Sequence, residues 1–309
     1  MNQPKPIFII GAPRSGTSIT TWALGQHPNI QPMPETAWIA SSAVGAFLSF
    51  AKGSERGKFS HLSNVDFPLE AFMAHMGTAS DKIVNDAFER RCKLLYGEKF
   101  RETGIEAKVR PKNRPAGMQL LRSIEDPKSR WVDGTPLNTQ FLWGLKLMFP
   151  DARFLHLLRA PEEVGASLLN FDDAGGISQP AKEALHTWST HTENASLALK
   201  AFGPETVLTV RYETLIDDQE HSIRTILDFL SEPYSPHCLQ PYDNKINSSK
   251  VDDKREDLQT QIRKLSDYRQ AKALHASADQ PARSDEDAAS ALDLLKQRFL
   301  DHCFHRTLI

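Results

Sequence analysis

The architecture is organised around one continuous segment, Ile7-Phe8-Ile9-Ile10-Gly11-Ala12-Pro13-Arg14-Ser15-Gly16-Thr17-Ser18. Four consecutive apolar residues that stop at a glycine predict a fully buried strand. Residues 18–26 then predict a helix, which His27-Pro28 ends. In such a turn, two glycines five positions apart let consecutive backbone amides wrap a phosphate, and the helix dipole favours the anion. We therefore predict that residues 11–18, called the glycine loop below, bind phosphate.

Farther along the chain, short apolar runs alternate with helical patterns. Strands are predicted over residues 130–133, 153–158 and 206–210, and helices over about 136–149, from 161 onward, over 181–202 and over 217–230. Such alternation predicts a parallel sheet whose ligands bind at the carboxyl ends of the strands. We expect an α/β fold, a P-loop-type parallel sheet flanked by helices on both faces, with helical insertions.

The 309 residues are expected to form a single domain. It would carry a helical insertion over about 36–128, with a break at 53–68, and a charged helical segment over about 251–309. Lys108, Arg110, Lys112 and Arg114 make residues 108–114 basic, which predicts an exposed loop whose role stays open.

Composition excludes several classes of protein. Hydrophobic residues are 40% and charged residues 25%, which is neither collagen-like nor disordered. A net charge of −2 gives no general attraction to nucleic acid. The three cysteines form no CxxC pair, which predicts no disulfide framework and a reducing compartment. Without a signal peptide or a membrane-spanning apolar stretch, the expected location is cytoplasmic. No His/Cys/Asp cluster has metal-ligand spacing, so no metal is expected.

The glycine loop departs from that of nucleoside triphosphatases. A Walker A loop needs a lysine directly after its second glycine, where it reaches the β- and γ-phosphates. Thr17 stands at that position, and the only cation of the loop is Arg14. ATP or GTP hydrolysis therefore loses its key cation, although a P-loop kinase with an unusual loop stays open as an alternative.

Pro13-Arg14-Ser15-Gly16-Thr17-Ser18 resembles the 5′-phosphosulfate-binding loop of sulfotransferases that use 3′-phosphoadenosine 5′-phosphosulfate (PAPS). Its form is similar to the tyrosylprotein-sulfotransferase branch and its bacterial relatives. Arg159, at the end of a predicted strand, and Ser167 in the next helix resemble the family's 3′-phosphate-binding element. Val210-Arg211-Tyr212-Glu213-Thr214-Leu215 resembles its Arg-Tyr-Glu-x-Leu element. The resemblance covers roughly residues 7–36 and 130–231.

The resemblance implies PAPS as cofactor, adenosine 3′,5′-bisphosphate as product and no metal. It also implies roles for particular residues. Arg14 would be catalytic at the leaving oxygen, and Glu35, in Pro34-Glu35-Thr36, would be the base for the acceptor hydroxyl. The residues expected to bind the cofactor are Arg14, Ser15, Gly16, Thr17, Ser18, Arg159, Ser167, Tyr212, Ser249 and Lys250.

One position departs from the family pattern. Relatives often carry a lysine before Thr-Pro, where this chain has Gly134 before Thr135-Pro136. Either another cation such as Lys250 substitutes, or the site relies on backbone amides and Arg14. Two histidines are expected to be structural, His27 at a helix end and His156 inside a buried strand.

The leading hypothesis is a PAPS-dependent sulfotransferase that moves a sulfuryl group to a hydroxyl of a small molecule, glycan or lipid. The alternatives are a P-loop kinase, which needs Mg²⁺, and a non-catalytic nucleotide-binding protein. Neither nucleic acid nor a transmembrane segment is expected, and a homodimer is left open.

Overall fold

The computed structural model describes residues 3–55, 60–105, 119–174, 176–243 and 254–305. Within these ranges five strands form one sheet with the order β2-β3-β1-β4-β5, and every neighbouring pair is parallel. The strands are β1 (Ile7–Ile10), β2 (Ile30–Pro32), β3 (Arg130–Asp133), β4 (Arg153–Leu158) and β5 (Val207–Arg211). The predicted α/β class with a parallel sheet is confirmed.

β1 lies at the centre of the sheet because its side chains are apolar on both faces. Ile7 pairs with Val132 of β3 on one side and with Arg153 of β4 on the other. All four residues of β1 are completely buried. The carboxyl ends of β1, β3 and β4 therefore meet at one edge of the sheet, where the glycine loop begins.

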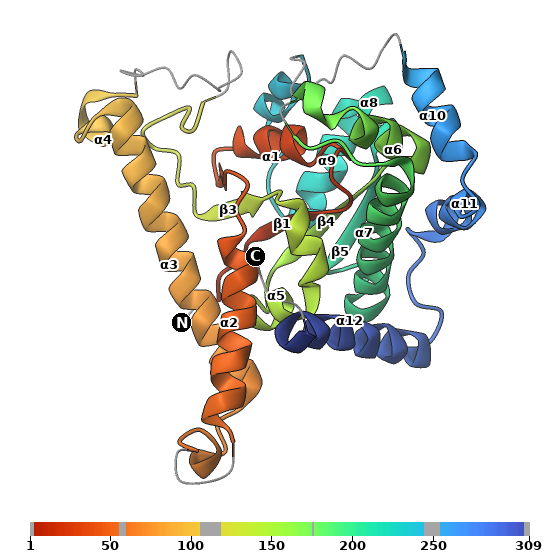
Figure 1. Ribbon diagram of the computed structural model, residues 1–309. Helices are drawn as coiled ribbons and strands as arrows, with labels where there is room; N and C mark the ends of the chain where they lie inside the picture. The colour runs from red at the N-terminus through yellow and green to blue at the C-terminus, as the bar shows by residue number, and fades with distance from the viewer. Residues whose placement is uncertain (1–2, 56–59, 106–118, 175, 244–253, 306–309) are drawn as a thin grey trace.

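Helices cover both faces of the sheet, as Figure 1 shows. The α-helices are α1 (Thr17–Gly25), α2 (Trp38–Gly53), α3 (Leu69–Tyr96), α4 (Phe100–Thr103), α5 (Leu142–Met148), α6 (Pro161–Leu169), α7 (Ala181–Phe202), α8 (Tyr212–Asp217), α9 (Gln219–Leu230), α10 (Arg255–Arg263), α11 (Tyr268–Ser277) and α12 (Asp285–His305). Short 3₁₀ turns are η1 (Ser63–Val65), η2 (Pro136–Gln140), η3 (Phe171–Ala174) and η4 (Pro236–Asp243).

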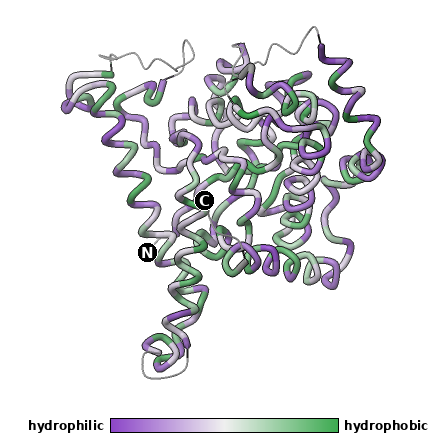
Figure 2. The backbone as a smooth tube through the Cα atoms, in the orientation of Figure 1, coloured by the Kyte–Doolittle hydropathy of each residue, from purple (hydrophilic) through white to green (hydrophobic). Residues whose placement is uncertain are grey.

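The alternation of side chains along β1 divides the core in two. Phe8 and Ile10 pack with residues of α2, α5, α7 and α12 on one face. Ile7 and Ile9 pack with residues of α1 and α9 on the other face. A strand sends successive side chains to opposite faces, so one short apolar run anchors both helical layers. Hydrophobic residues gather along the strands, whereas α10 and α11 are mostly hydrophilic (Figure 2).

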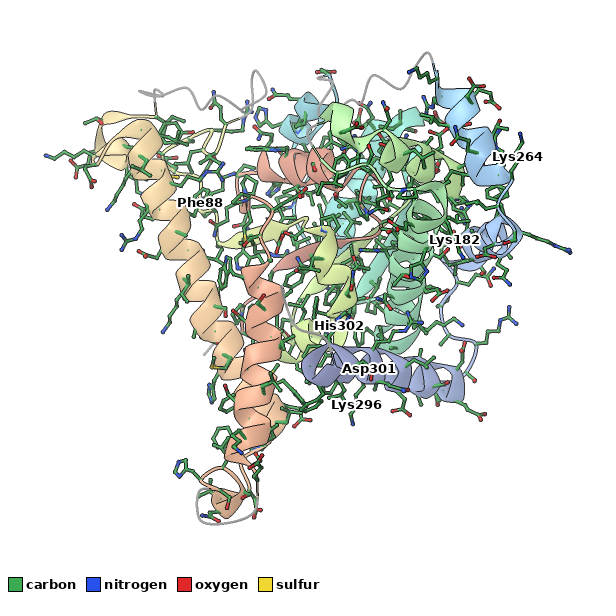
Figure 3. All side chains as sticks on the ribbon, viewed as in Figure 1. Phe88, Lys182, Lys264, Lys296, Asp301 and His302 are labelled. Atoms are coloured by element: carbon green, nitrogen blue, oxygen red, sulfur yellow. The ribbon has the colours of Figure 1, made fainter. Side chains whose placement is uncertain are left out.

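The residues of the predicted insertion include α2 and α3, which pack against each other. In Figure 1 their connected ends lie below the sheet, and α3 runs back up beside it to α4. The charged carboxyl-terminal segment consists of α10, α11 and α12. On α12, Phe299 is completely buried. Lys296 and Asp301 of the same helix are exposed (Figure 3). Residues 108–114, predicted to be a loop, lie outside the described residues. No described helix is long and apolar enough to cross a membrane.

One strand was missed and one local prediction was wrong. β2 was not predicted, because three residues that end in Pro32 carry almost no strand signal. A proline is tolerated there because β2 is an edge strand. The helix predicted over 136–149 is divided into η2 and α5. In η2 the Thr139 hydroxyl accepts from Gly11 N at 3.0 Å and donates to Gly11 O at 3.3 Å, which ties this turn to the glycine loop.

Lys128 supports the end of α1 from inside the protein. Its ammonium donates to the carbonyl oxygens of Gly25, His27 and Ile30 at 2.9, 2.7 and 2.9 Å. The residue is only 4% exposed. Burial lowers the pKa of Lys128 to about 8, which still leaves the ammonium charged at neutral pH. The last carbonyls of a helix lack intrahelical partners, so this side chain joins α1 to β2.

We expect Lys128→Met to lower the free energy of unfolding by about 1–3 kcal/mol, because three carbonyl oxygens lose their donor in a buried place. Urea unfolding at pH 7 measures the change. Lys99→Met, which replaces an exposed lysine, is the matched control and should leave stability within about 0.5 kcal/mol. Equal effects of the two substitutions would contradict this account of Lys128.

Candidate active site

The glycine loop follows β1 in a conformation that needs glycine at two positions. Gly11 and Gly16 have φ angles of 134° and 97°. A Cβ on Gly16 would lie 2.5 Å from Cε2 of Tyr212, and one on Gly11 would lie 2.6 Å from the carbonyl oxygen of Leu157. The loop therefore packs directly against the ends of β4 and β5, and a larger residue has no room at either glycine.

Arg14 adopts the left-handed backbone conformation, with a φ of 71°. For a residue other than glycine this costs about 1–2 kcal/mol. Arg159, which follows β4, holds the strained residue in place, because its Nη1 donates to the carbonyl oxygen of Arg14 at 3.0 Å. Backbone strain at a loop between strand and helix is typical of functional sites.

The guanidinium of Arg14 lies toward α6. Its Nε donates to Ser167 Oγ at 2.9 Å, and its Cζ lies 4.8 Å from the centre of the Phe171 ring. Burial and the positive charge of Arg159 lower the pKa of Arg14, while Glu35 raises it. Two cations held close together in a partly buried place favour an anionic ligand.

The amino terminus of α1 is open toward such a ligand. No side chain caps the helix, and its first turn holds no acidic residue. The first amides of a helix have no intrahelical partner, so they favour an anion. The Ser15 hydroxyl, in a residue that is 1% exposed, is buried without a hydrogen-bond partner. An unmatched buried hydroxyl in a loop of this shape is consistent with a bound phosphate group.

Arg159 connects the loop to two further elements. Its guanidinium lies 4.6 Å from the centre of the Tyr212 ring, and its Nη2 pairs with Glu163 Oε2 at 3.2 Å. Arg255 of α10 pairs with the same oxygen, and Gln259 Nε2 donates to Glu163 Oε1 at 2.7 Å. Glu163 therefore joins Arg159 to α10.

Glu35 lies on the other side of the loop, after β2. Its Oε1 accepts a hydrogen bond from Ser18 Oγ at 3.0 Å. The next amide, Thr36 N, donates to Thr135 Oγ1 at 2.8 Å. Glu35 is exposed, so its carboxylate is available to a molecule from solvent. The structure thus brings together Arg14, Ser15, Gly16, Thr17, Ser18, Glu35, Arg159, Ser167 and Tyr212, all predicted from the sequence.

Close packing against α1 explains why position 134 is a glycine. A Cβ there would lie 2.0 Å from Thr21 Oγ1 and 3.2 Å from the carbonyl oxygen of Thr17, both in α1. A lysine at this position would require α1 to move. Ser249 and Lys250, predicted to bind the cofactor, lie outside the described residues, so their placement stays a prediction.

Both histidines have structural surroundings, as expected. His27 Nδ1 accepts from Asn29 N at 3.1 Å, so Nε2 carries the proton and donates to the carbonyl oxygen of Pro233 at 2.9 Å. His156 is fully buried in β4, and burial lowers its pKa to about 3. Its Nδ1 lies 3.1 Å from Thr209 Oγ1.

Sequence reasoning missed the residues that support the site. Thr135 and Thr139 hold the glycine loop and its neighbour, Phe171 stacks on Arg14, and Glu163 pairs with Arg159. Each of these residues contacts its partner across a long separation in the sequence or through a single polar atom. No local pattern in the sequence distinguishes the two threonines.

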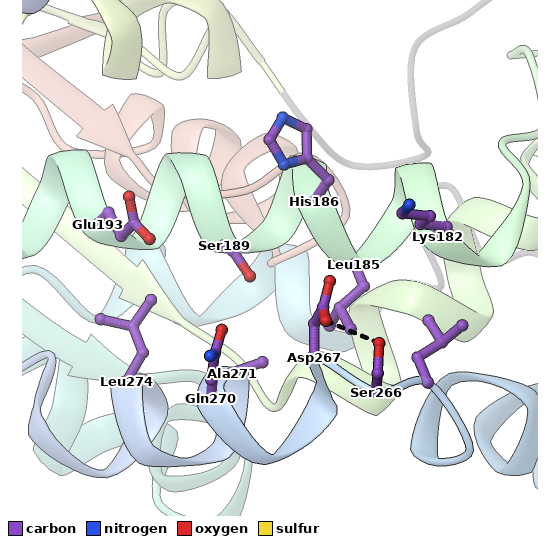
Figure 4. A pocket seen from close by; sticks show the side chains of 11 residues that line it. Lys182, Leu185, His186, Ser189, Glu193, Ser266, Asp267, Gln270, Ala271 and Leu274 are labelled. Carbon is purple, nitrogen blue, oxygen red and sulfur yellow. Dashed lines mark hydrogen bonds between the residues drawn. The ribbon is translucent and has the colours of Figure 1, made fainter.

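A groove of about 400 Å³ lies between α7 and α11 (Figure 4). Lys182, His186, Glu193 and Gln270 line it, and none of its lining residues belongs to the glycine loop. Within the described ranges, no group of three His, Cys, Asp or Glu residues is placed to hold a metal ion.

Known proteins are similar to this chain in sequence. A protein from Aquifex aeolicus described as uncharacterized is 25% identical over 250 residues, which cover 78% of this chain and 27% of that protein. A protein-tyrosine sulfotransferase of Drosophila melanogaster is 22% identical over 251 residues, which cover 80% of this chain and 42% of that protein. The chain thus spans less than half the length of either relative.

Among solved structures, the sulfotransferase domain from the curacin biosynthetic pathway has the same fold, with a TM-score of 0.52 and 15% identity. The match covers 89% of this chain and 99% of that domain. The model of the sulfotransferase family matches residues 6–236, from the strand before the glycine loop to the turn after α9. A match over well over half of the sequence, on this fold and this loop, makes the chain a member of the sulfotransferase family.

Proposed function

We propose that the protein is a PAPS-dependent sulfotransferase that transfers a sulfuryl group to a hydroxyl of a small molecule, glycan or lipid. The observation that carries the proposal is the convergence of Arg14, Arg159 and Ser167 beside the uncapped start of α1, with Glu35 on the opposite side. That arrangement supports separate binding of two anionic groups and of an acceptor.

The residues present fit a nucleotide with phosphates at both the 5′ and the 3′ position. The loop amides and the Ser15 hydroxyl suit the 5′ group, since that hydroxyl is buried and unmatched. Arg159 and Ser167 suit the 3′-phosphate, because a guanidinium and a hydroxyl both donate to phosphate oxygens. ATP lacks a 3′-phosphate, so this second set of donors favours PAPS over ATP.

Arg14 and Glu35 have separate roles in the proposed reaction. PAPS supplies a sulfuryl group whose S–O bond to the 5′-phosphate breaks as a bond from the acceptor oxygen to sulfur forms. Glu35 takes the proton of the acceptor hydroxyl, and Arg14 stabilises the negative charge that develops on the leaving phosphate oxygen. The products are a sulfate ester and adenosine 3′,5′-bisphosphate. We propose that no metal is needed, because Arg14 and the backbone amides of the glycine loop, with Lys250 as a further candidate, neutralise this charge.

We also propose the domain organisation, the cellular location and the class of acceptor. The chain acts as a single domain over residues 1–309 and works in the cytoplasm, in line with its free cysteines. Its acceptor is a small molecule, glycan or lipid rather than a nucleic acid, since the net charge is close to neutral. A homodimer is compatible with these features.

Turnover of PAPS tests the proposal. The purified protein is incubated with PAPS and 2-naphthol, n-octanol or N-acetylglucosamine, and both products are measured, with EDTA or with Mg²⁺. We expect transfer to at least one acceptor, unchanged by EDTA. In parallel, thermal shifts should favour adenosine 3′,5′-bisphosphate over ATP. A preference for ATP with Mg²⁺ would indicate the kinase instead, and bisphosphate binding without transfer would indicate a non-catalytic binding protein.

We expect Arg159→Ala to weaken adenosine 3′,5′-bisphosphate more than adenosine 5′-phosphate, because Arg159 is the proposed partner of the 3′-phosphate. Loss of such a charge-assisted contact costs about 2–5 kcal/mol. Both ligands should lose some affinity, since Arg159 also holds the carbonyl of Arg14. Calorimetry with both ligands measures the difference, and Arg90→Ala on the exposed side of α3 is the control. Equal losses for the two ligands would remove the 3′-phosphate role.

A further inference from the structure

A chain of hydrogen bonds joins the end of β3 to the loop that carries Glu35. Thr36 N donates to Thr135 Oγ1 at 2.8 Å, and Thr135 Oγ1 donates to Asp133 Oδ1 at 2.5 Å. The direction of both hydrogen bonds is fixed. The amide of Thr36 can only donate, so the Thr135 hydroxyl accepts from it and gives its single hydrogen to the carboxylate of Asp133. The position of Thr36, and with it of its neighbour Glu35, is therefore set by Asp133.

Asp133 is a rigid anchor for this chain. The residue is completely buried, and Thr135 is 7% exposed. Asp133 Oδ1 also accepts from Thr135 N at 2.9 Å, and Oδ2 accepts from Asn138 Nδ2 at 2.8 Å. Burial raises the pKa of Asp133, and the bonds from Thr135 and Asn138 act against this rise. A buried carboxyl group that accepts three hydrogen bonds leaves little freedom to the residues that donate them.

The turn after β3 does not itself need the link to Thr36. The hydrogen bond from Thr135 N to Asp133 Oδ1 already closes that turn, as an aspartate side chain commonly does. The Thr135 hydroxyl adds a contact to a segment 99 residues away. The same segment contains the exposed Glu35, whose carboxylate accepts a hydrogen bond from Ser18 Oγ at 3.0 Å. Glu35 is thus fixed at its backbone from β3 and at its carboxylate from α1.

We propose that Thr135, anchored by Asp133, is a positioning residue that places Glu35 for proton transfer. This inference rests on the proposed function, because it takes Glu35 as the base. A misplacement of about 1 Å in a reacting group lowers the rate about 100-fold. Loss of the Thr135 hydroxyl therefore acts on the chemical step, while the nucleotide, which contacts other residues, binds as before.

The test compares Thr135→Val, which lacks the hydroxyl, with Thr135→Ser, which keeps it. With PAPS and whichever of 2-naphthol, n-octanol and N-acetylglucosamine the wild type uses, we expect Thr135→Val to lower kcat about 10- to 100-fold. Thr135→Ser should stay within about threefold of the wild type. The Kd of adenosine 3′,5′-bisphosphate should change less than twofold in both. If Thr135→Val does not fold, Thr135→Ala removes the same hydroxyl without adding bulk at a buried position.

A double variant separates positioning from a general loss of structure. In the Glu35→Gln background, Thr135→Val should lower kcat by no more than about twofold, because the group it places is already disabled. The same loss in both backgrounds, or a fall in nucleotide affinity that matches the fall in kcat, would overturn the inference. A wild type that transfers no sulfuryl group overturns the proposed function as well, whereas an active wild type with an equally active Thr135→Val overturns the positioning role alone.

Discussion

Glu35→Gln should lower kcat about 10²- to 10⁴-fold, the usual contribution of a positioned general base. Glutamine keeps the oxygen that accepts from Ser18 Oγ, so the loop after β2 should hold its place while the proton acceptor is lost. The affinity for adenosine 3′,5′-bisphosphate should hardly change, because the carboxylate faces the acceptor. Steady-state kinetics and calorimetry on the same preparation measure both quantities.

The acidity of the acceptor gives Glu35 a second test. A phenol with a lower pKa needs less help from a base, so 4-nitrophenol should recover part of the lost rate relative to phenol. Glu98→Gln, which makes the same change at an exposed glutamate after α3, is the matched control. Near-normal turnover by Glu35→Gln would refute the assignment. His27 would not take its place, because both of its ring nitrogens are already bonded.

Replacing Arg14 by alanine should lower kcat about 10²- to 10³-fold, comparable to the loss of one donor from a site that stabilises developing negative charge. Arg14→Gly should be as inactive as Arg14→Ala but more stable than it by about 1 kcal/mol. The reason is that glycine adopts a φ of 71° without the strain that alanine retains. The pair therefore separates the chemical role of the side chain from the conformational strain of the backbone.

Urea unfolding and steady-state kinetics on both Arg14 variants provide these numbers. Pro13→Ala, beside Arg14 in the same loop, is the control for a change that leaves the cation in place. Equal stability of Arg14→Gly and Arg14→Ala would mean that the left-handed conformation carries no strain. Turnover near wild type in either variant would assign the leaving-group role to another cation.

The fold could be predicted because its central signals are local. Ile7 to Ile10 and the glycines that follow specify a strand, a turn and a helix within about 20 residues, without help from the rest of the chain. β4 and α7 were predicted with the bounds that the structure has, because each is a long pattern with clear ends. β2 failed for the opposite reason, since its existence depends on pairing with β3 and not on its own three residues.

The candidate site could be predicted only in part. Residues that recur at strand ends in a recognisable order, such as Arg14, Arg159 and Tyr212, were found from the sequence. Thr135 could not be identified, because its contact with Thr36 spans 99 residues and neither threonine differs from any other in the sequence. The absence of a side chain at Gly134 was visible, but its cause, the approach of Thr21, lies in the packing of α1 against β3.

The central position of β1 in the sheet has a consequence for the synthesis of the protein. Gly11 leaves the ribosome 128 residues before its partner Thr139. At about 5–20 residues per second, the ribosome needs roughly 6–25 s to make that length of chain. Throughout this time Ile7 to Ile10 is an unpaired, uncharged apolar strand, the kind of segment that associates with other chains. During synthesis these four residues are therefore open to pairing with other chains until β3 and β4 emerge to cover them.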